Sequence, residues 1–146
     1  MARQRSRRVI VLDPTHDTWD ADFQTADNDE FLEIFWSPEW LCCDVFIDES
    51  GDAIGQYDKI MLRTATLGRK QGHSVRFITQ RGAQLSPTVR GQCEELFLFR
   101  MATNDAQVLA REWVQPELEY AFQLPKGTCY YVSRYGDLKT LEVFAT

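Results

Sequence analysis

The sequence has 146 residues, of which 44% are hydrophobic and 26% charged, with 5 prolines and 8 glycines. This composition suits a single globular domain over residues 1–146 and excludes a disordered tract, and no apolar run is long enough for a membrane span or a secretory signal. The formal net charge of -6 marks an acidic protein, which we expect to be soluble and cytoplasmic.

The first predicted element is a strand at Val9–Leu12, an unbroken apolar run typical of a strand covered on both faces. The Asp13-Pro14 step ends it, because proline lacks the N–H that a sheet requires. Residues 15–30 are polar and acidic and are predicted to be a surface connection. Residues 29–36 have apolar side chains at helical spacing, although a strand is also compatible, and Ser37-Pro38 predicts a short helix.

The second stretch of the chain alternates strands with helices. A strand from about Asp44 is followed by a helix over 57–71, with Ile60 facing inward and Gly72 as its stop signal. Residues 74–79 are predicted to form the next strand. Ser86-Pro87 predicts a short helix that ends near Cys93.

The last part of the chain begins with a strand at 96–100 and a helix that Thr103 caps and Pro116 breaks. Residues 117–122 suit a short second helical piece. Residues 128–133 and 139–144 flank Tyr135-Gly136-Asp137, a hairpin signal. Together these elements predict an α/β fold with a mostly parallel sheet, flanking helices and a C-terminal β-hairpin.

Polar side chains follow three predicted strands at their carboxyl ends: Asp13, Asp48-Glu49 and Thr79-Gln80-Arg81. Ligands of parallel α/β sheets bind beyond these ends, so the three together favour a site. Asp48 could hold Mg²⁺ through water, and Glu49 could orient or deprotonate an attacking water. Gln80 could sense a γ-phosphate through its donor and acceptor ends. The 146 residues contain no G-x-x-x-x-G-K-S/T phosphate loop.

Arg69 lies at the end of the predicted helix 57–71. A guanidinium at that place either stabilises the helix dipole or reaches a phosphate of a neighbouring subunit as an arginine finger. Further candidates for such a role are Arg63, Arg81 and Arg100.

Charge is segregated along the chain. Residues 9–58 contain 14 acids and neither lysine nor arginine, whereas residues 59–146 contain 12 bases and 8 acids. The second part could therefore carry a basic face for phosphates, but charge alone favours a solvated acidic surface without a partner. The four cysteines lack C-x-x-C spacing and only two histidines are present, so we expect buried thiols rather than a zinc site.

In these segments and their order, from about Arg8 to Phe144, the chain resembles the P-loop ATPases of the FtsK/HerA superfamily, the ring motors that pump DNA. Val9–Leu12 with Asp13-Pro14 is similar to the strand after the phosphate-loop helix, and Val45–Glu49 to the Walker B strand. Gly68–Gly72 is similar to the helix end that supplies a trans-acting arginine, and Phe77–Arg81 to the sensor strand.

The resemblance implies ATP and Mg²⁺ as cofactors, a homo-oligomeric ring, with a hexamer expected, and DNA as a partner of that ring. It assigns catalysis to Glu49, Gln80 and Arg69, cofactor contacts to Asp13, Thr79 and Arg81, and the metal to Asp48. The chain departs from the family because the Walker A residues have no counterpart. We expect an incomplete P-loop NTPase-like domain, a fragment that begins partway into an ATPase. The missing strand would leave exposed sheet edges, which predicts poor solubility or obligate association.

Two other functions remain open on the sequence. A degenerate ATPase fold could serve as a non-catalytic assembly or binding subunit, without nucleotide affinity. A Mg²⁺-dependent nuclease or phosphotransferase could use Asp13, Asp48 and Glu49 as metal ligands, although no lysine accompanies these acids before Lys59.

Overall fold

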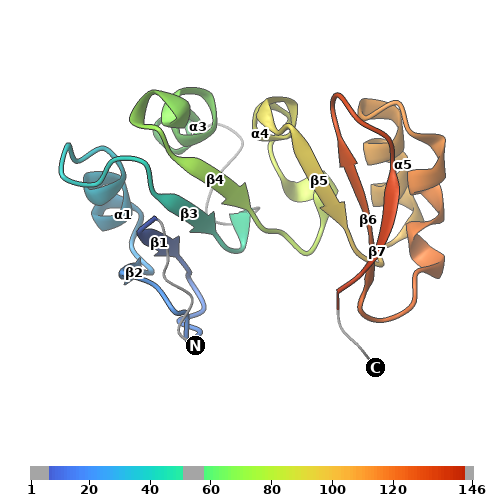
Figure 1. Ribbon diagram of the computed structural model, residues 1–146, viewed down its shortest axis with the longest axis horizontal. Helices are drawn as coiled ribbons and strands as arrows, with labels where there is room; N and C mark the ends of the chain where they lie inside the picture. Colours follow the sequence, from blue (N-terminus) through green and yellow to red (C-terminus); the bar gives the residue numbers. More distant parts are fainter. Residues whose placement is uncertain (1–6, 51–57, 144–146) are drawn as a thin grey trace. The chain divides into compact units, whose positions relative to one another are not determined.

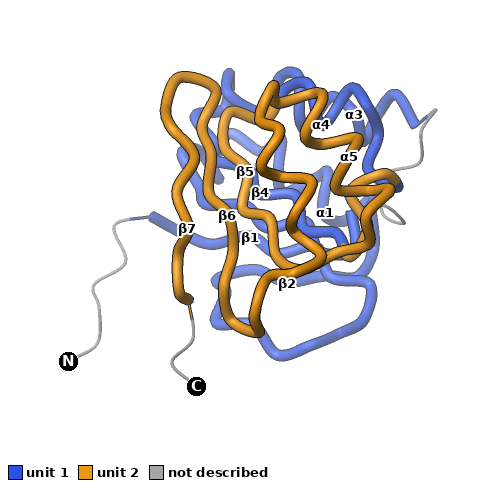
Figure 2. The backbone as a smooth tube through the Cα atoms, turned by 90° about the vertical axis from the view of Figure 1, so that its right-hand side faces the viewer, with its two compact units in different colours: residues 1–79, 84–92 blue, residues 80–83, 93–146 orange. Residues whose placement is uncertain are grey.

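The computed structural model describes residues 7–50 and 58–143, and the chain divides into two compact units. Unit 1 consists of residues 1–79 and 84–92, and unit 2 of residues 80–83 and 93–146 (Figure 2). Across the described ranges, no helix is both long and apolar enough to cross a membrane. A single domain and a cytoplasmic location stay predictions.

Unit 1 is built on a four-stranded sheet in which every neighbouring pair is parallel. Its strands are β1 (Val9–Leu12), β2 (Phe23–Thr25), β3 (Asp44–Ile47) and β4 (Ser74–Phe77), in the spatial order β2-β1-β3-β4 (Figure 1). The central position of β1 explains its unbroken apolar run, because Ile10, Val11 and Leu12 are all fully buried.

The helices described in unit 1 are α1 (Asn28–Phe35), α3 (Lys59–Leu67), its 3-10 continuation η1 (Gly68–Gln71), and α4 (Pro87–Gln92). Asp27 and Asp58 cap α1 and α3 by accepting backbone N–H groups of the first turn. Gly72 follows η1 in the left-handed conformation, with φ of 74°, which confirms it as the stop of the predicted helix. Phe31 and Phe35 are the buried side chains of α1.

Two local predictions for unit 1 are wrong. Ser37-Pro38 starts a turn rather than a helix, in which Trp40 N–H donates to the carbonyl of Ser37 at 3.0 Å. The Arg8 guanidinium, 4.2 Å from the centre of the Trp40 ring, holds this turn through a tertiary contact. The predicted surface connection 15–30 contains β2, which forms because its backbone pairs with β1.

Unit 2 contains an antiparallel sheet in the order β5-β6-β7, with β5 at Glu95–Leu98, β6 at Thr128–Ser133 and β7 at Lys139–Glu142. The predicted C-terminal hairpin is confirmed as β6 and β7. Helix α5 (Thr103–Glu112) begins after Ala102 without a side-chain cap, so the predicted capping role of Thr103 is wrong. The second helical piece is the 3-10 helix η3 (Pro116–Gln123). Another short 3-10 helix, η2 (Gly82–Gln84), has residues in both units.

The core of unit 2 lies between α5, η3 and the sheet. Its buried members come from all three: Leu98, Ala106, Leu109, Ala110, Trp113, Leu118, Ala121, Leu124 and Val132. With the parallel sheet and helices of unit 1, this arrangement confirms the predicted mixed α/β fold class.

Both sheets have strands with one unpaired side among the described residues. In its sheet β4 pairs only with β3, and β5 only with β6. A parallel sheet is normally covered, and an open edge accepts a further strand. Exposed edges left by a missing strand, and the poor solubility expected from them, stay predictions.

Candidate functional site

The carboxyl ends of β1 and β3 place two acids next to each other. The parallel hydrogen-bond ladder continues one residue past each strand: Asp13 N–H donates to the Thr25 carbonyl at 2.9 Å, and Asp48 N–H to the Leu12 carbonyl at 2.9 Å. Because β1 and β3 are neighbours, Asp13 and Asp48 lie side by side at the carboxyl ends of the strands. Parallel sheets bind their ligands beyond these carboxyl ends.

Asp13 is the anchor of the loop that follows β1. Its carboxylate accepts the N–H and hydroxyl of Thr15 at 2.8 and 2.7 Å, the N–H of Asp17 at 2.9 Å and the indole N–H of Trp19 at 2.9 Å. The side chain is fully buried. Burial raises its pKa, but the four hydrogen bonds outweigh burial and lower the pKa of Asp13 below its usual 3.8. Asp13 is therefore an ionised, hydrogen-bonded group that fixes the loop.

Asp48 and Glu49 form a tight turn at the end of β3. The Glu49 N–H donates to Oδ1 of Asp48 at 2.9 Å, and Glu49 has φ of 47°, in the left-handed region. A non-glycine residue in that conformation costs about 1–2 kcal/mol, and such strain clusters at functional sites. Both side chains are half-buried.

Asp13, Asp17 and Asp48 form a group whose carboxylate oxygens lie within 4.8 Å of one another. Carboxylate oxygens are the ligands that Mg²⁺ prefers, so the donor chemistry of this group fits the ion that the sequence predicts at Asp48. Asp17 carries no signal of its own in the sequence, because it lies in the acidic segment 15–30 that is predicted to be a surface connection. Its proximity to Asp48 depends on the loop that Asp13 closes.

Ser50 ties the Asp48-Glu49 turn to the neighbouring strand β4. Its N–H donates to the Ile78 carbonyl at 2.8 Å, and its hydroxyl accepts the Ile78 N–H at 3.1 Å and donates to the Ile47 carbonyl. Ser50 is fully buried. The turn that carries Glu49 is thus fixed to the segment that leads into Thr79. The sequence gives no local signal for this role, since the partner lies 28 residues away.

The remaining predicted residues of the sensor segment divide between the units. Thr79 ends the first part of unit 1, whereas Gln80 and Arg81 belong to unit 2. In unit 2, Arg81 Nε donates to Oδ2 of Asp105 at 3.2 Å, and Asp105 is only 3% exposed. Arg81 therefore balances a buried carboxylate in the first turn of α5. The cofactor roles of Thr79 and Arg81 stay predictions.

The predicted arginine finger lies near the amino ends of the strands, opposite the carboxyl ends that carry the acids. Arg69 is in η1, which precedes β4, so it lies near the amino ends of the strands and away from Asp48 and Glu49 of the same chain. Arg63 is exposed on α3 and lines a shallow pocket of about 420 Å³ with Trp36, Ile60 and Leu67. Ile60 is 64% exposed, so its predicted inward position is wrong.

The amino ends of the strands are held by Arg7 and His73. Arg7 donates to the carbonyls of Cys42, Cys43 and Gly72. His73 Nδ1 accepts the Cys43 N–H at 3.1 Å, and its Nε2 lies 2.8 Å from the Phe35 carbonyl. Burial, with a smaller contribution from Arg7, lowers the pKa of His73 below 6.5, although the Phe35 bond opposes this. His73 therefore has a structural role, because its ring joins the backbone of Cys43 to that of Phe35.

No protein-family model matches the sequence, and a search of curated proteins gives no match. Solved structures do match. The chain is similar to B204, the DNA-packaging ATPase from Sulfolobus turreted icosahedral virus, with a TM-score of 0.75 and 16% identity, covering 95% of this chain and 84% of that one. The genome packaging NTPase B204 from Sulfolobus turreted icosahedral virus 2 in complex with ATP-γS gives a TM-score of 0.76 at 14% identity, over 96% and 84%.

VirB4 of Thermoanaerobacter pseudethanolicus is also similar, with a TM-score of 0.63 and 13% identity, and the match covers 89% of this chain and 43% of that one. At these identities the likeness is one of fold. The α/β fold of this chain is similar to the folds of these proteins, which agrees with the predicted fold class.

Proposed function

We propose that this chain is the Walker B and sensor portion of an ATP-driven DNA translocase or genome-packaging ATPase, inactive by itself because the phosphate loop is missing. One observation carries the proposal: Asp48-Glu49 follows the central strand β3 in a fold similar to that of a DNA-packaging ATPase. The proposed site is complete only together with a phosphate loop, which these 146 residues do not contain.

In this proposal Asp48 holds Mg²⁺ through water, with the oxygens of Asp13 and Asp17 beside it. Mg²⁺ supplies charge neutralisation at the β- and γ-phosphates when bound. Glu49 orients the attacking water and accepts its proton. Its strained backbone, held through Ser50, fixes the direction in which the Glu49 side chain leaves the turn.

The other predicted residues complete the proposed site. Gln80 senses the γ-phosphate, while Thr79 and Arg81 contact the nucleotide. Arg69 acts on the site of the next subunit, a role supported by its place near the strand ends opposite Asp48. This requires a homo-oligomeric ring, for which we propose a hexamer, with DNA passing through it.

The test is Glu49→Gln in the protein that also contains the phosphate loop, with the exposed Glu39→Gln as the matched control. We expect Glu49→Gln to abolish ATP turnover with unchanged ATP affinity, because an amide cannot accept the proton of the attacking water. Glu39→Gln should leave both unchanged. Turnover retained in Glu49→Gln would remove Glu49 from its role.

A second candidate is a non-catalytic assembly or binding subunit with a degenerate ATPase fold. The observation that favours it is the absence of G-x-x-x-x-G-K-S/T from the 146 residues, since the phosphates then lack their backbone cradle. It predicts no ATP affinity and specific association with a partner chain. Calorimetric titration of the full-length protein with Mg²⁺ and ATP distinguishes the two candidates, because only the first predicts that this protein binds ATP.

A further inference from the structure

Asp105 is a buried acid for which the proposed function has no role. It lies in the first turn of α5, where an acidic side chain often caps the helix by accepting a backbone N–H. Helix α5 nevertheless begins without a side-chain cap, and Asp105 is only 3% exposed. Its carboxylate instead accepts the Nε–H of Arg81 at 3.2 Å, from a residue 24 positions earlier in the chain. A buried carboxylate needs such a partner, so Asp105 serves a contact far from its own helix turn.

A second contact with α5 holds the residue next to Arg81. Gly82 is buried, and a Cβ added to it would lie 2.9 Å from Cδ1 of Leu109. The backbone can approach Leu109 this closely because glycine has no side chain. Asp105 and Leu109 are four residues apart on α5, so the two contacts lie on one face of the helix. The 80–82 segment is therefore attached to α5 at two places.

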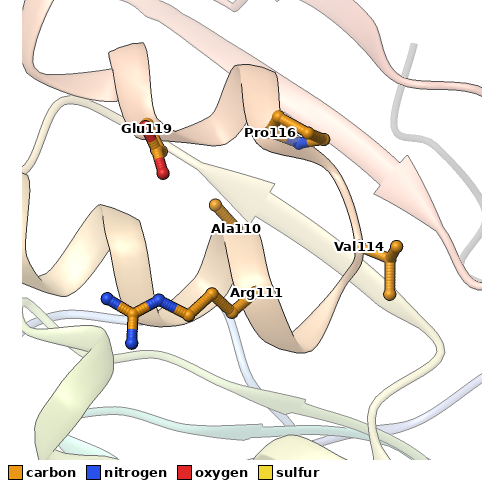
Figure 3. A pocket seen from close by; sticks show the side chains of 5 residues that line it. All are labelled: Ala110, Arg111, Val114, Pro116 and Glu119. Carbon is orange, nitrogen blue, oxygen red and sulfur yellow. The ribbon is translucent and has the colours of Figure 1, made fainter.

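Helix α5 is itself fixed in the core of unit 2. Leu109 and Ala110 are each 4% exposed, and Figure 3 shows Ala110 between α5 and η3. Trp113 follows at the end of α5 and belongs to the same core. A segment attached to α5 therefore takes its position from a packed core. This applies to Gln80, which directly precedes Arg81 and belongs to unit 2.

We propose that Asp105 is a positioning residue for Gln80: by holding Arg81, it fixes the direction from which Gln80 meets the γ-phosphate. This inference rests on the proposed function, in which Gln80 senses that phosphate. Asp105 acts through Arg81 and not through contact with the nucleotide. A polar side chain on a short connecting segment gains strength and specificity when a neighbouring contact holds it in the productive geometry.

The relative affinity for ATP-γS and ADP tests this role in the full-length protein. Calorimetric titration with each nucleotide and Mg²⁺ gives the ratio of the two dissociation constants. An unfolded fraction lowers the number of sites and leaves this ratio unchanged. Asp105→Ala should lower the preference for ATP-γS about tenfold, the expected loss of one hydrogen bond to a charged phosphate. The fold should persist, because the variant removes the buried charge rather than the partner of that charge.

Two further variants on the first turn of α5 are controls. Asp105→Asn should keep most of the preference for ATP-γS, because its amide oxygen can still accept the Arg81 Nε–H. Asn104→Ala changes the exposed neighbour of Asp105 and should bind both nucleotides like the wild type. Gly82→Val disturbs the other contact and should reproduce the loss seen in Asp105→Ala, because the new side chain would push the segment away from Leu109.

Gln80→Ala shows whether Asp105 acts through Gln80. Alone it should lower the preference for ATP-γS about tenfold, and adding Asp105→Ala should cause no further loss. An unchanged preference in Asp105→Ala, or a further loss in the double variant, would overturn the inference and leave the role of Gln80 intact. An unchanged preference in Gln80→Ala, or a wild type that binds neither nucleotide, would contradict the proposed function and, with it, this inference.

Discussion

Ser50→Ala is the sharpest test of how the Asp48-Glu49 turn is held. The change removes the hydroxyl that accepts the Ile78 N–H at 3.1 Å and donates to the Ile47 carbonyl. Neither partner is left unsatisfied, because Ile78 N–H also donates to the Ile47 carbonyl at 2.9 Å. The expected loss is therefore that of two net hydrogen bonds, about 1.5 kcal/mol, without a further desolvation penalty.

Native-state hydrogen exchange measures this loss locally. An opening energy lowered by about 1.5 kcal/mol should speed exchange of the Ile78 amide roughly tenfold. Ser86→Ala is the matched control, since Ser86 is also buried and its hydroxyl accepts the Thr88 N–H at 3.2 Å. Equal exchange at Ile78 in both variants would refute the proposed link between the turn and β4.

Three further predictions concern stability, each measured by urea unfolding. The pKa of His73 is lowered in the folded state, so the unfolded chain binds a proton more readily. The free energy of unfolding should therefore be highest above pH 6.5 and should decrease as the pH falls below 6.5, by at most about 1.4 kcal/mol per pH unit. His16→Asn should keep this dependence, and its persistence in a His73→Gln variant would contradict the assignment. Glu49→Gly should raise the free energy of unfolding by roughly 1 kcal/mol, because glycine adopts the positive φ without strain. A lower free energy of unfolding would show that no strain is stored at this residue. Gly72→Ala should lower the free energy of unfolding by about 2 kcal/mol, because φ of this residue is 74° and the new Cβ would lie 2.6 Å from the Cys42 Sγ. An unchanged urea midpoint would show that the turn adapts to the new side chain.

The sequence predicts a strand well where it contains a run of apolar residues. It predicts a strand poorly where the segment is extended only because its backbone pairs with a neighbouring strand. Val9–Leu12 is predicted because four apolar residues in a row suit a central parallel strand. Phe23–Thr25 is missed because three residues with one large apolar side chain carry no period, and the pairing with β1 makes them a strand. The predicted helix at Ser37-Pro38 fails since a tertiary contact, Arg8 over Trp40, holds a turn there.

Two acids of the candidate site can be predicted from the sequence, whereas Asp17 and Ser50 cannot. Asp13 and Asp48 follow directly from their places at the ends of apolar strands. Asp17 joins them only because the carboxylate of Asp13 closes the intervening loop. Ser50 acts through a residue far along the chain, so its role requires the pairing of β3 and β4.

The most direct test of the proposed nucleotide-hydrolysing role is a sequence read of the DNA upstream of the Met1 codon. About 30 codons are enough for a strand, a phosphate loop and its helix. The account predicts an open frame that encodes G-x-x-x-x-G-K-S/T, joined to the strand at Val9. An in-frame stop with a ribosome-binding site before Met1 would contradict it and favour the non-catalytic subunit.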